Sequence, residues 1–186
     1  MRNYDTITDL GFEFVDGIEN PSGLSEQAFL VRASDIAVEA VPSAVGTTAA
    51  SIVQIATSHT LKAGKKAIPV EILYGKSGAP FKLSGEELSK VFESDPVVFI
   101  PQLNAQTLGG AVVIKNSRYL VFVRRPGQLV GYWQIGSKGM TAKVQDIAGG
   151  FGSGATGEVG LMVSLKAFGT APMYEYQGEL PVAVVA

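Results

Sequence analysis

The chain has 186 residues, of which 46% are hydrophobic and 17% are charged, and its formal net charge is −2 at pH 7. It holds no cysteine and one histidine, which excludes disulfides, thiolate metal sites, cysteine nucleophiles and histidine-based metal clusters. An ordinary soluble domain carries roughly 25% charged residues, so this chain has few charges with which to cover its surface. The composition favours a subunit that buries surface against copies of itself, and the net charge disfavours a basic nucleic-acid-binding surface.

Neither a targeting signal nor a membrane helix is expected. The first residues, MRNYDTITDLGFEF, lack the apolar h-region of a signal peptide. The longest uncharged stretch, residues 40–61, includes Pro42, Gly46 and many Ser and Thr residues. It falls short of the roughly 20 strongly apolar residues that a membrane helix needs. We therefore expect a soluble protein, made in a reducing cytoplasm and without a membrane partner.

Residues 1–34 show no sustained periodicity and are broken by glycines and by the cluster Asn20-Pro21-Ser22-Gly23. We interpret them as an N-terminal arm or irregular extension, or a pair of short strands, and residues 35–186 as the main domain. Strands are predicted in that domain from alternating or β-branched apolar runs between turn residues. They cover residues 35–41, 51–61, 68–74, 97–100, 111–114, 119–124, 129–135, 141–147, 161–168, 173–176 and 180–185.

One short helix is predicted at residues 84–93. Ser84 suits an N-cap, and Glu86 and Glu87 would lie in the first turn, where the helix dipole favours acidic side chains. Four apolar residues are compatible with one helical face: Leu83, Leu88, Val91 and Phe92. Two exposed hairpins are predicted, one through the LKAGKK turn at residues 61–66 and one through residues 115–117. About ten strands and one helix predict a mainly β protein, with a β-sandwich or β-barrel architecture.

A glycine-rich segment matches the letters of a dinucleotide-binding motif. Residues 152–157 read G-S-G-A-T-G, the pattern G-x-G-x-x-G. That motif needs a helix after its last glycine, but Val159, Leu161, Val163 and Leu165 alternate as in a strand. We therefore interpret the segment as a mobile or interfacial hairpin loop and expect no cofactor.

Other residues that could carry chemistry have a simpler interpretation. His59 is expected at the surface or in an interface, since Ser58 beside it in a strand would point to the opposite face. Basic residues near the turns lack the interleaved aromatic side chains of a stacking platform and are interpreted as solvated. Because no catalytic set, metal site or calcium-binding motif is present in the sequence, we expect no enzymatic activity.

The layout of the second half resembles the tail tube, or major tail, proteins of bacteriophages. The matching parts read RYLVFVRR, GYWQIGSKG, TAKVQDI, GGFGSGATG, VGLMVSLKAFG and APMYEY. The LKAGKKAIPVEILYG hairpin and the predicted helix also fit that family's fold. The resemblance covers residues 35–176 and rests on the order of parts rather than on one diagnostic motif.

This resemblance implies a tail-tube-like subunit that forms hexameric rings stacked into a hollow tube in the virion tail. Such a protein is structural, not enzymatic, and is synthesised in the host cytoplasm. Its partners would be copies of itself, with tape-measure, sheath or tail-terminator proteins beside them, and DNA would pass through the lumen without being held. A wall that passes DNA should avoid strong positive charge.

Candidate positions follow from that expectation. Polar side chains on three predicted strands are assigned to the lumen, with Lys166 as the one contrary residue: Gln54, Ser58, Glu71 and Ser164. The residues of the predicted hairpin loop are assigned to contacts between stacked rings: Lys62, Gly64, Lys65 and Lys66. Deletion of residues 1–20 is expected to impair polymerisation, because the arm is assigned to the same contacts.

Two alternatives remain open. The chain could be another β-rich virion component, such as a capsid decoration protein. It could also be a β-sandwich carbohydrate-binding or adhesion module in which Tyr132, Trp133 and Tyr174 contact a sugar, although aromatic residues in strands usually belong to a core or an interface.

Overall fold

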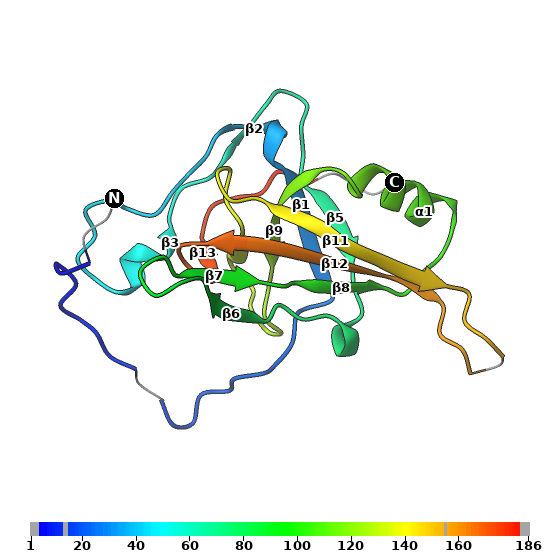
Figure 1. Cartoon of the computed structure of the whole chain (residues 1–186), viewed down its shortest axis with the longest axis horizontal. Helices are drawn as coiled ribbons and strands as arrows, with labels where there is room; N and C mark the ends of the chain where they lie inside the picture. Colours follow the sequence, from blue (N-terminus) through cyan, green and yellow to red (C-terminus); the bar gives the residue numbers. More distant parts are fainter. Residues whose placement is uncertain (1–3, 13–14, 155, 183–186) are drawn as a thin grey trace.

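The strand at the centre of the fold, β9 (Arg118–Val123), is buried on both faces in the computed structural model, which describes residues 4–12, 15–154 and 156–182 (Figure 1). Tyr119, Val121 and Val123 belong to one hydrophobic cluster, while Leu120 and Phe122 belong to a second. The strand β1 (Gln27–Arg32) beside it divides in the same way between the two clusters. Consecutive apolar residues form these strands because both faces are covered.

The fold is mainly β, as the sequence predicts, and most strands belong to one branched sheet of 11 strands. Its main path runs β3-β13-β10-β9-β11-β12-β7-β6; β1 joins β9 and β5, and β8 joins β12. β2 and β4 form a separate pair. The remaining strands are β2 (Ile36–Val38), β3 (Gln54–Ile55), β4 (Thr60–Leu61), β5 (Ile68–Glu71), β6 (Phe81–Ser84), β7 (Val91–Ser94), β8 (Val97–Ile100), β10 (Tyr132–Ile135), β11 (Ala142–Gly150), β12 (Gly160–Gly169) and β13 (Tyr174–Tyr176).

The sheet branches because β9 and β12 each pair with different strands along their length. One edge of β9 pairs with β1, while the other pairs with β10 over Val121–Val123 and with β11 over Arg118–Tyr119. β12 pairs with β11 on one edge and with β8 and β7 in succession on the other. The branches fold over one another and enclose the first cluster, an arrangement consistent with the predicted sandwich or barrel.

The α-helix lies at a different place from the predicted one. α1 (Ala105–Ile114) includes residues 111–114, which the sequence analysis assigned to a strand. It begins with a capping box, in which Asn104 accepts from the Thr107 N–H and Thr107 accepts from the Asn104 N–H. Ala111 and Ile114, three residues apart, pack against the first cluster, so packing overrides the β-branched run.

The prediction of a helix at residues 84–93 is wrong, because this segment belongs to the β6–β7 hairpin. Leu83 and Phe92, which were assigned to one helical face, are partners across the two strands. The turn depends on Gly85, which has a φ of 110° and lies so close to the chain that a Cβ would be 2.5 Å from the Ser89 carbonyl oxygen. The apolar residues that suggested one face of a helix are therefore brought together by the pairing of β6 with β7.

The single strand predicted at residues 51–61 is also wrong. It is divided into the 3₁₀ turn η2 (Ala50–Ile52) and the short strands β3 and β4. Ser51 donates through its hydroxyl to the Thr48 carbonyl and through its N–H to Thr48 Oγ1, and these local bonds compete with strand pairing. Two further 3₁₀ turns, η1 (Ala33–Asp35) and η3 (Tyr74–Lys76), connect other strands.

Neither predicted hairpin is present. The turn at residues 62–66 is exposed, but its flanking strands have different partners, β4 with β2 and β5 with β1. Residues 115–117 lead from α1 into β9. The predicted strand at 35–41 is reduced to β2. Of the one predicted at 180–185, residues 180–182 are described, and among them Val182 forms an isolated bridge with Ala67.

The other strand predictions are confirmed within a few residues, including all five strands of the second half from β9 to β13. Among the described residues up to 34, the regular strand is β1, which lies in the centre of the sheet, whereas residues 4–12 and 15–26 are irregular. Within the described residues, no helix is long and apolar enough to cross a membrane.

Candidate self-association surface

A long hairpin extends from the body of the molecule. β11 and β12 are antiparallel from Gly150↔Gly160 to Lys143↔Lys166, and their connecting loop reaches one end of the longest axis (Figure 1). The hairpin packs closely on β8, since a Cβ on Gly160 would be 2.3 Å from Phe99 Cζ. One face of β12 enters the first cluster, and its other face carries Met162, which is 37% exposed.

The loop of this hairpin contains the glycine motif, and its prediction as a hairpin loop is confirmed. Gly152 and Gly154 have φ values of 71° and 69°, which side-chain-bearing residues rarely adopt. The motif leads into strand β12 rather than a helix, so the loop lacks the helix N-terminus that binds a pyrophosphate.

We therefore predict that titration with NAD, FAD or ATP in a calorimeter gives no heat of binding. The physical reason is the missing helix N-terminus, which supplies converging N–H donors in dinucleotide sites. A micromolar dissociation constant for any of the three would contradict this interpretation of the loop.

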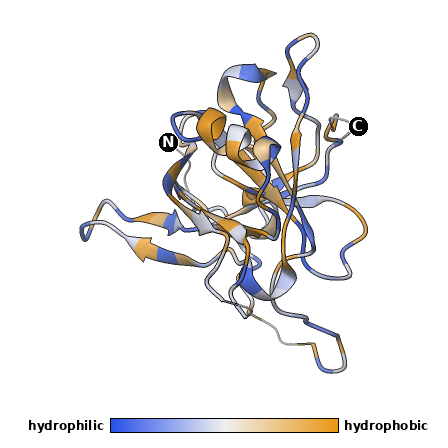
Figure 2. Cartoon of the chain, turned by 90° about the vertical axis from the view of Figure 1, so that its right-hand side faces the viewer, coloured by the Kyte–Doolittle hydropathy of each residue, from blue (hydrophilic) through white to orange (hydrophobic). Residues whose placement is uncertain are grey.

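The chain exposes more surface than a compact monomer of its size. Its accessible surface is 11475 Å², whereas a folded monomer of 19.5 kDa exposes about 8,500 Å² by the usual scaling with mass. Hydrophobic residues reach the outer elements of the fold, including the helix and the connecting loops (Figure 2). Excess surface of this composition is typical of a subunit that is covered by neighbours.

The exposed apolar side chains include large ones on separate elements. Phe151 in the β11–β12 loop is 74% exposed, and Leu88 in the β6–β7 turn is 99% exposed. On α1, Leu108, Val112 and Val113 are 47%, 63% and 53% exposed. Since α1 has no fully buried residue, it covers the first cluster with one side and leaves the other apolar side to solvent in the single subunit.

An apolar groove of about 600 Å³ lies between the start of β6, the start of β13 and the segment before β1. We call it the Trp133 groove. Its main apolar walls are Leu24, Ala79, Phe81, Trp133 and Met173, and Arg124 and Arg125 add two guanidinium groups. Sequence reasoning missed this groove, because its residues come from segments far apart in the chain.

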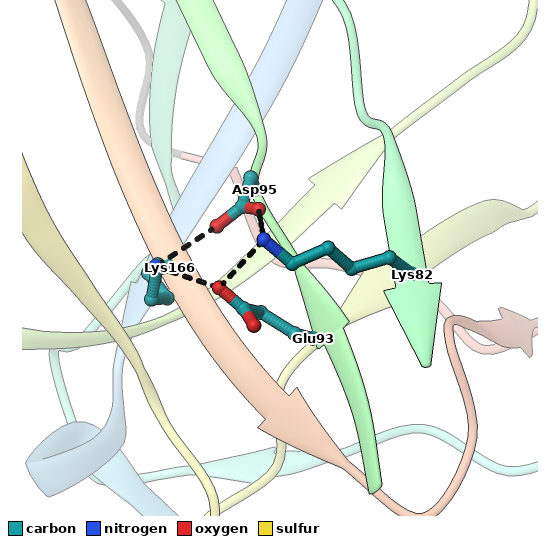
Figure 3. Close-up of polar contacts among 4 residues, drawn as sticks. All are labelled: Lys82, Glu93, Asp95 and Lys166. Carbon is teal, nitrogen blue, oxygen red and sulfur yellow. Dashed lines mark ion pairs between the residues drawn. The ribbon is translucent and has the colours of Figure 1, made fainter. Parts of the chain in front are cut away.

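A four-residue ion-pair cluster joins β6, β7 and β12 (Figure 3). Glu93, which is 6% exposed, has its Oε1 2.6 Å from Lys166 Nζ and 3.3 Å from Lys82 Nζ. Asp95 lies 3.7 Å from Lys166 Nζ and 3.8 Å from Lys82 Nζ. The hydrogen bond from Lys166 lowers the pKa of Glu93, and the same bond raises the pKa of Lys166. Both lysines are thus matched by carboxylates.

His59 lies inside the protein, contrary to the prediction of a surface or interface residue. It is 5% exposed and stacks on Tyr176, with ring centroids 4.7 Å apart. Its Nδ1 accepts from the Ala40 N–H at 3.0 Å, and its Nε2 is 2.8 Å from Gln134 Oε1. Because Nδ1 is an acceptor, the neutral ring carries its proton on Nε2 and donates to Gln134.

The residues assigned to a lumen lie on elements that do not pair with one another. Gln54 in β3 donates to Glu175 Oε2 at 2.8 Å, and Ser58 in the following loop accepts from the Glu179 N–H. Glu71 ends β5 opposite Gln27, and Ser164 lies in β12. The partners of these strands are β13 for β3, β1 for β5, and β7, β8 and β11 for β12, so they form no continuous wall within one subunit.

The residues assigned to ring stacking form a solvent-exposed turn. Gly64 has a φ of 73°, and the Lys65 N–H donates to the Lys62 carbonyl at 3.0 Å. Lys65 Nζ lies 3.8 Å from Asp35, and Lys66 is exposed. Their exposure leaves them accessible to a neighbouring subunit.

The aromatic residues considered for a sugar site do not share one surface. Tyr132 is 9% exposed and packs in the second cluster, with Tyr174 against that cluster, whereas Trp133 packs against the first. Adjacent residues of a strand point to opposite faces, which separates Tyr132 from Trp133.

Within residues 4–12, 15–154 and 156–182, no three His, Cys, Asp or Glu side chains are grouped so that they could hold a metal ion. Comparison with known proteins gives no match, whether with protein-family models, curated proteins or solved structures.

Proposed function

We propose that this chain is a structural subunit that assembles into stacked rings around a lumen, like the tail tube proteins of bacteriophages. The observation that carries the proposal is the exposure of apolar side chains on the hairpin, the helix and β6. It comes with an accessible surface of 11475 Å², to which the irregular, exposed segment before β1 also contributes. Heterologous contacts between such surfaces close into rings when the rotation allows it.

The fold of the second half supports the same proposal. The segments that resemble tail tube proteins form β9, β10, β11, β12 and β13 in chain order, with the glycine loop between β11 and β12. The other two parts of the resemblance do not support it, since residues 84–93 form a hairpin turn and strands, and residues 62–66 do not join paired strands. The proposal therefore depends on the second half.

The ion-pair cluster removes one objection to a DNA-conducting lumen. Ser164 and Lys166, two residues apart, lie on the same face of β12, where the lysine was contrary to the predicted charge. Glu93 and Asp95 pair with Lys166 and Lys82, so the cluster has no net charge. Such a face would not hold a phosphate backbone strongly.

The proposal includes a place in the virion tail and a hexameric ring. It also includes tape-measure, sheath and tail-terminator proteins as partners. The separation of Tyr132 from Trp133 weighs against the carbohydrate-binding alternative. A decoration protein of a capsid would also expose apolar surface, but it would not form tubes.

We expect the purified chain to form rings or tubes far above the 19.5 kDa monomer. Sedimentation velocity over a concentration series from micromolar to millimolar measures the size, and negative-stain microscopy shows whether rings stack. The physical reason is burial of exposed apolar surface, which should also make assembly weaken on cooling. A chain that remains monomeric throughout the series, at low and at high salt, would contradict the proposed function.

A further inference from the structure

The Trp133 groove has the chemistry of a site for an apolar segment with acidic residues nearby. Its walls are mainly apolar, and its lining contains Arg124 and Arg125 but no carboxylate. The Arg125 guanidinium lies over the Trp133 ring, 5.9 Å from its centroid, whereas the Arg124 guanidinium lies over Tyr132 on the other face of the strand.

The outer half of the β11–β12 hairpin has the complementary chemistry. Between Val144 and Leu165 the only charged residues are Asp146 and Glu158, both acidic. At the tip, Phe151 is 74% and Val159 is 41% exposed. Glu158 pairs with Lys76 within the subunit, so Asp146 is the charge left for a basic partner surface.

The tip lies at one end of the molecule, away from the groove. In Figure 1 the β11–β12 loop forms the right-hand end, whereas β3, β13 and β6, around the groove, lie toward the left. The tip of a subunit therefore reaches a groove on another copy rather than its own. Contact between two different patches is heterologous and propagates from copy to copy.

We propose that the β11–β12 tip of one subunit docks in the Trp133 groove of the next, with Phe151 against the apolar walls and Asp146 toward Arg125. This inference rests on the proposed self-assembly and names the two surfaces that carry it. Burial of an aromatic side chain in an apolar groove supplies affinity, and opposite charges orient the contact.

Cysteine cross-linking tests this contact cleanly, because the chain has no cysteine of its own. Phe151→Cys and Ala79→Cys proteins are prepared separately, mixed under assembling conditions and treated with a short bismaleimide. Ala79 lines the groove, and its replacement adds only a thiol. The matched control pairs Phe151→Cys with Val45→Cys, since Val45 is 88% exposed and lines no part of the groove.

The expected result is a covalent dimer from the Phe151→Cys and Ala79→Cys mixture, in clear excess over the control mixture. Assembly by sedimentation without that excess overturns this contact and leaves the proposed function standing. If the mixture stays monomeric and the unmodified chain, tested in parallel, also stays monomeric, both this contact and the proposed function are overturned.

A second variant measures the energetic contribution of the tip. Phe151→Ser should weaken assembly about tenfold to a hundredfold, as expected for loss of one buried aromatic side chain. Val45→Ser is the matched control, because Val45 is 88% exposed in a turn that belongs to none of the candidate surfaces, and the assembly constant should stay within about threefold. Equal effects of the two substitutions would contradict a specific role for Phe151.

Discussion

Replacement of Phe122 by alanine should lower the free energy of unfolding by about 3–5 kcal/mol. Phe122 is fully buried at the middle of β9, with ring centroids 5.2 Å from Tyr176, 5.9 Å from His59 and 6.2 Å from Tyr132. Removal of its ring leaves a cavity that three other rings line, and rings held in several strands close such a cavity poorly. The free energy of unfolding of most domains is only about 5–15 kcal/mol, so a large part of the stability depends on this side chain.

Urea denaturation of dilute protein, followed by circular dichroism, measures this change. Phe151→Ala is the matched control, because the same atoms are removed from a side chain that is 74% exposed. Its stability should change by no more than about 0.5 kcal/mol in the single subunit. A loss below about 1 kcal/mol for Phe122→Ala would contradict the packing of the second cluster.

The sequence predicted the strands whose patterns reflect a simple environment. In β12, Leu161, Val163 and Leu165 alternate with half-exposed residues because one face lies on the core. In β9 the apolar run is continuous because both faces are buried. Each pattern follows directly from the side-chain period of a strand, so local reasoning was sufficient.

Local reasoning failed where distant residues determine the structure. The AVVI run at residues 111–114 favours a strand, but the capping box at Asn104 starts a helix that the core then holds. Leu83 and Phe92 suggested a helical face, although their relation is a cross-strand pair through a glycine turn. Both errors arose from apolar spacing that fits two structures, which only the turn and capping residues distinguish.

The candidate surfaces were predicted only in part. The glycine loop was recognised because the alternation after Gly157 is local information. The Trp133 groove was not, since it joins segments from Gly23 to Met173. His59 was placed at the surface or in an interface because its main contacts inside the protein come from distant parts of the chain: Tyr176 stacks on its ring, and Gln134, 75 positions away, pairs with its Nε2. Low charge indicated association, but the sequence held no signal for which surfaces take part.

The buried imidazole makes stability depend on pH. Burial lowers the pKa of His59 below its usual 6.5, and the hydrogen bond with Gln134 and the charge of Glu39 oppose that shift only in part. A folded-state pKa below the unfolded value means that the unfolded chain binds the proton more readily. The stability is therefore complete above about pH 6.5 and is lost as the pH falls below it, by up to about 1.4 kcal/mol per pH unit until the folded-state pKa is reached.

The structural reason is the acceptor role of Nδ1. A proton there would face the Ala40 N–H, so one hydrogen bond is lost and two donors are opposed at 3.0 Å. We expect urea denaturation to show falling stability between pH 8 and pH 5.5, a range above the titration of carboxyls such as Glu93, whose pKa is lowered. The His59→Gln variant, which cannot titrate, should be less stable at pH 8 but should keep a nearly constant stability across this range. Parallel pH curves for the two proteins would show that His59 is not the group responsible, because only the titrating ring can make the slope differ.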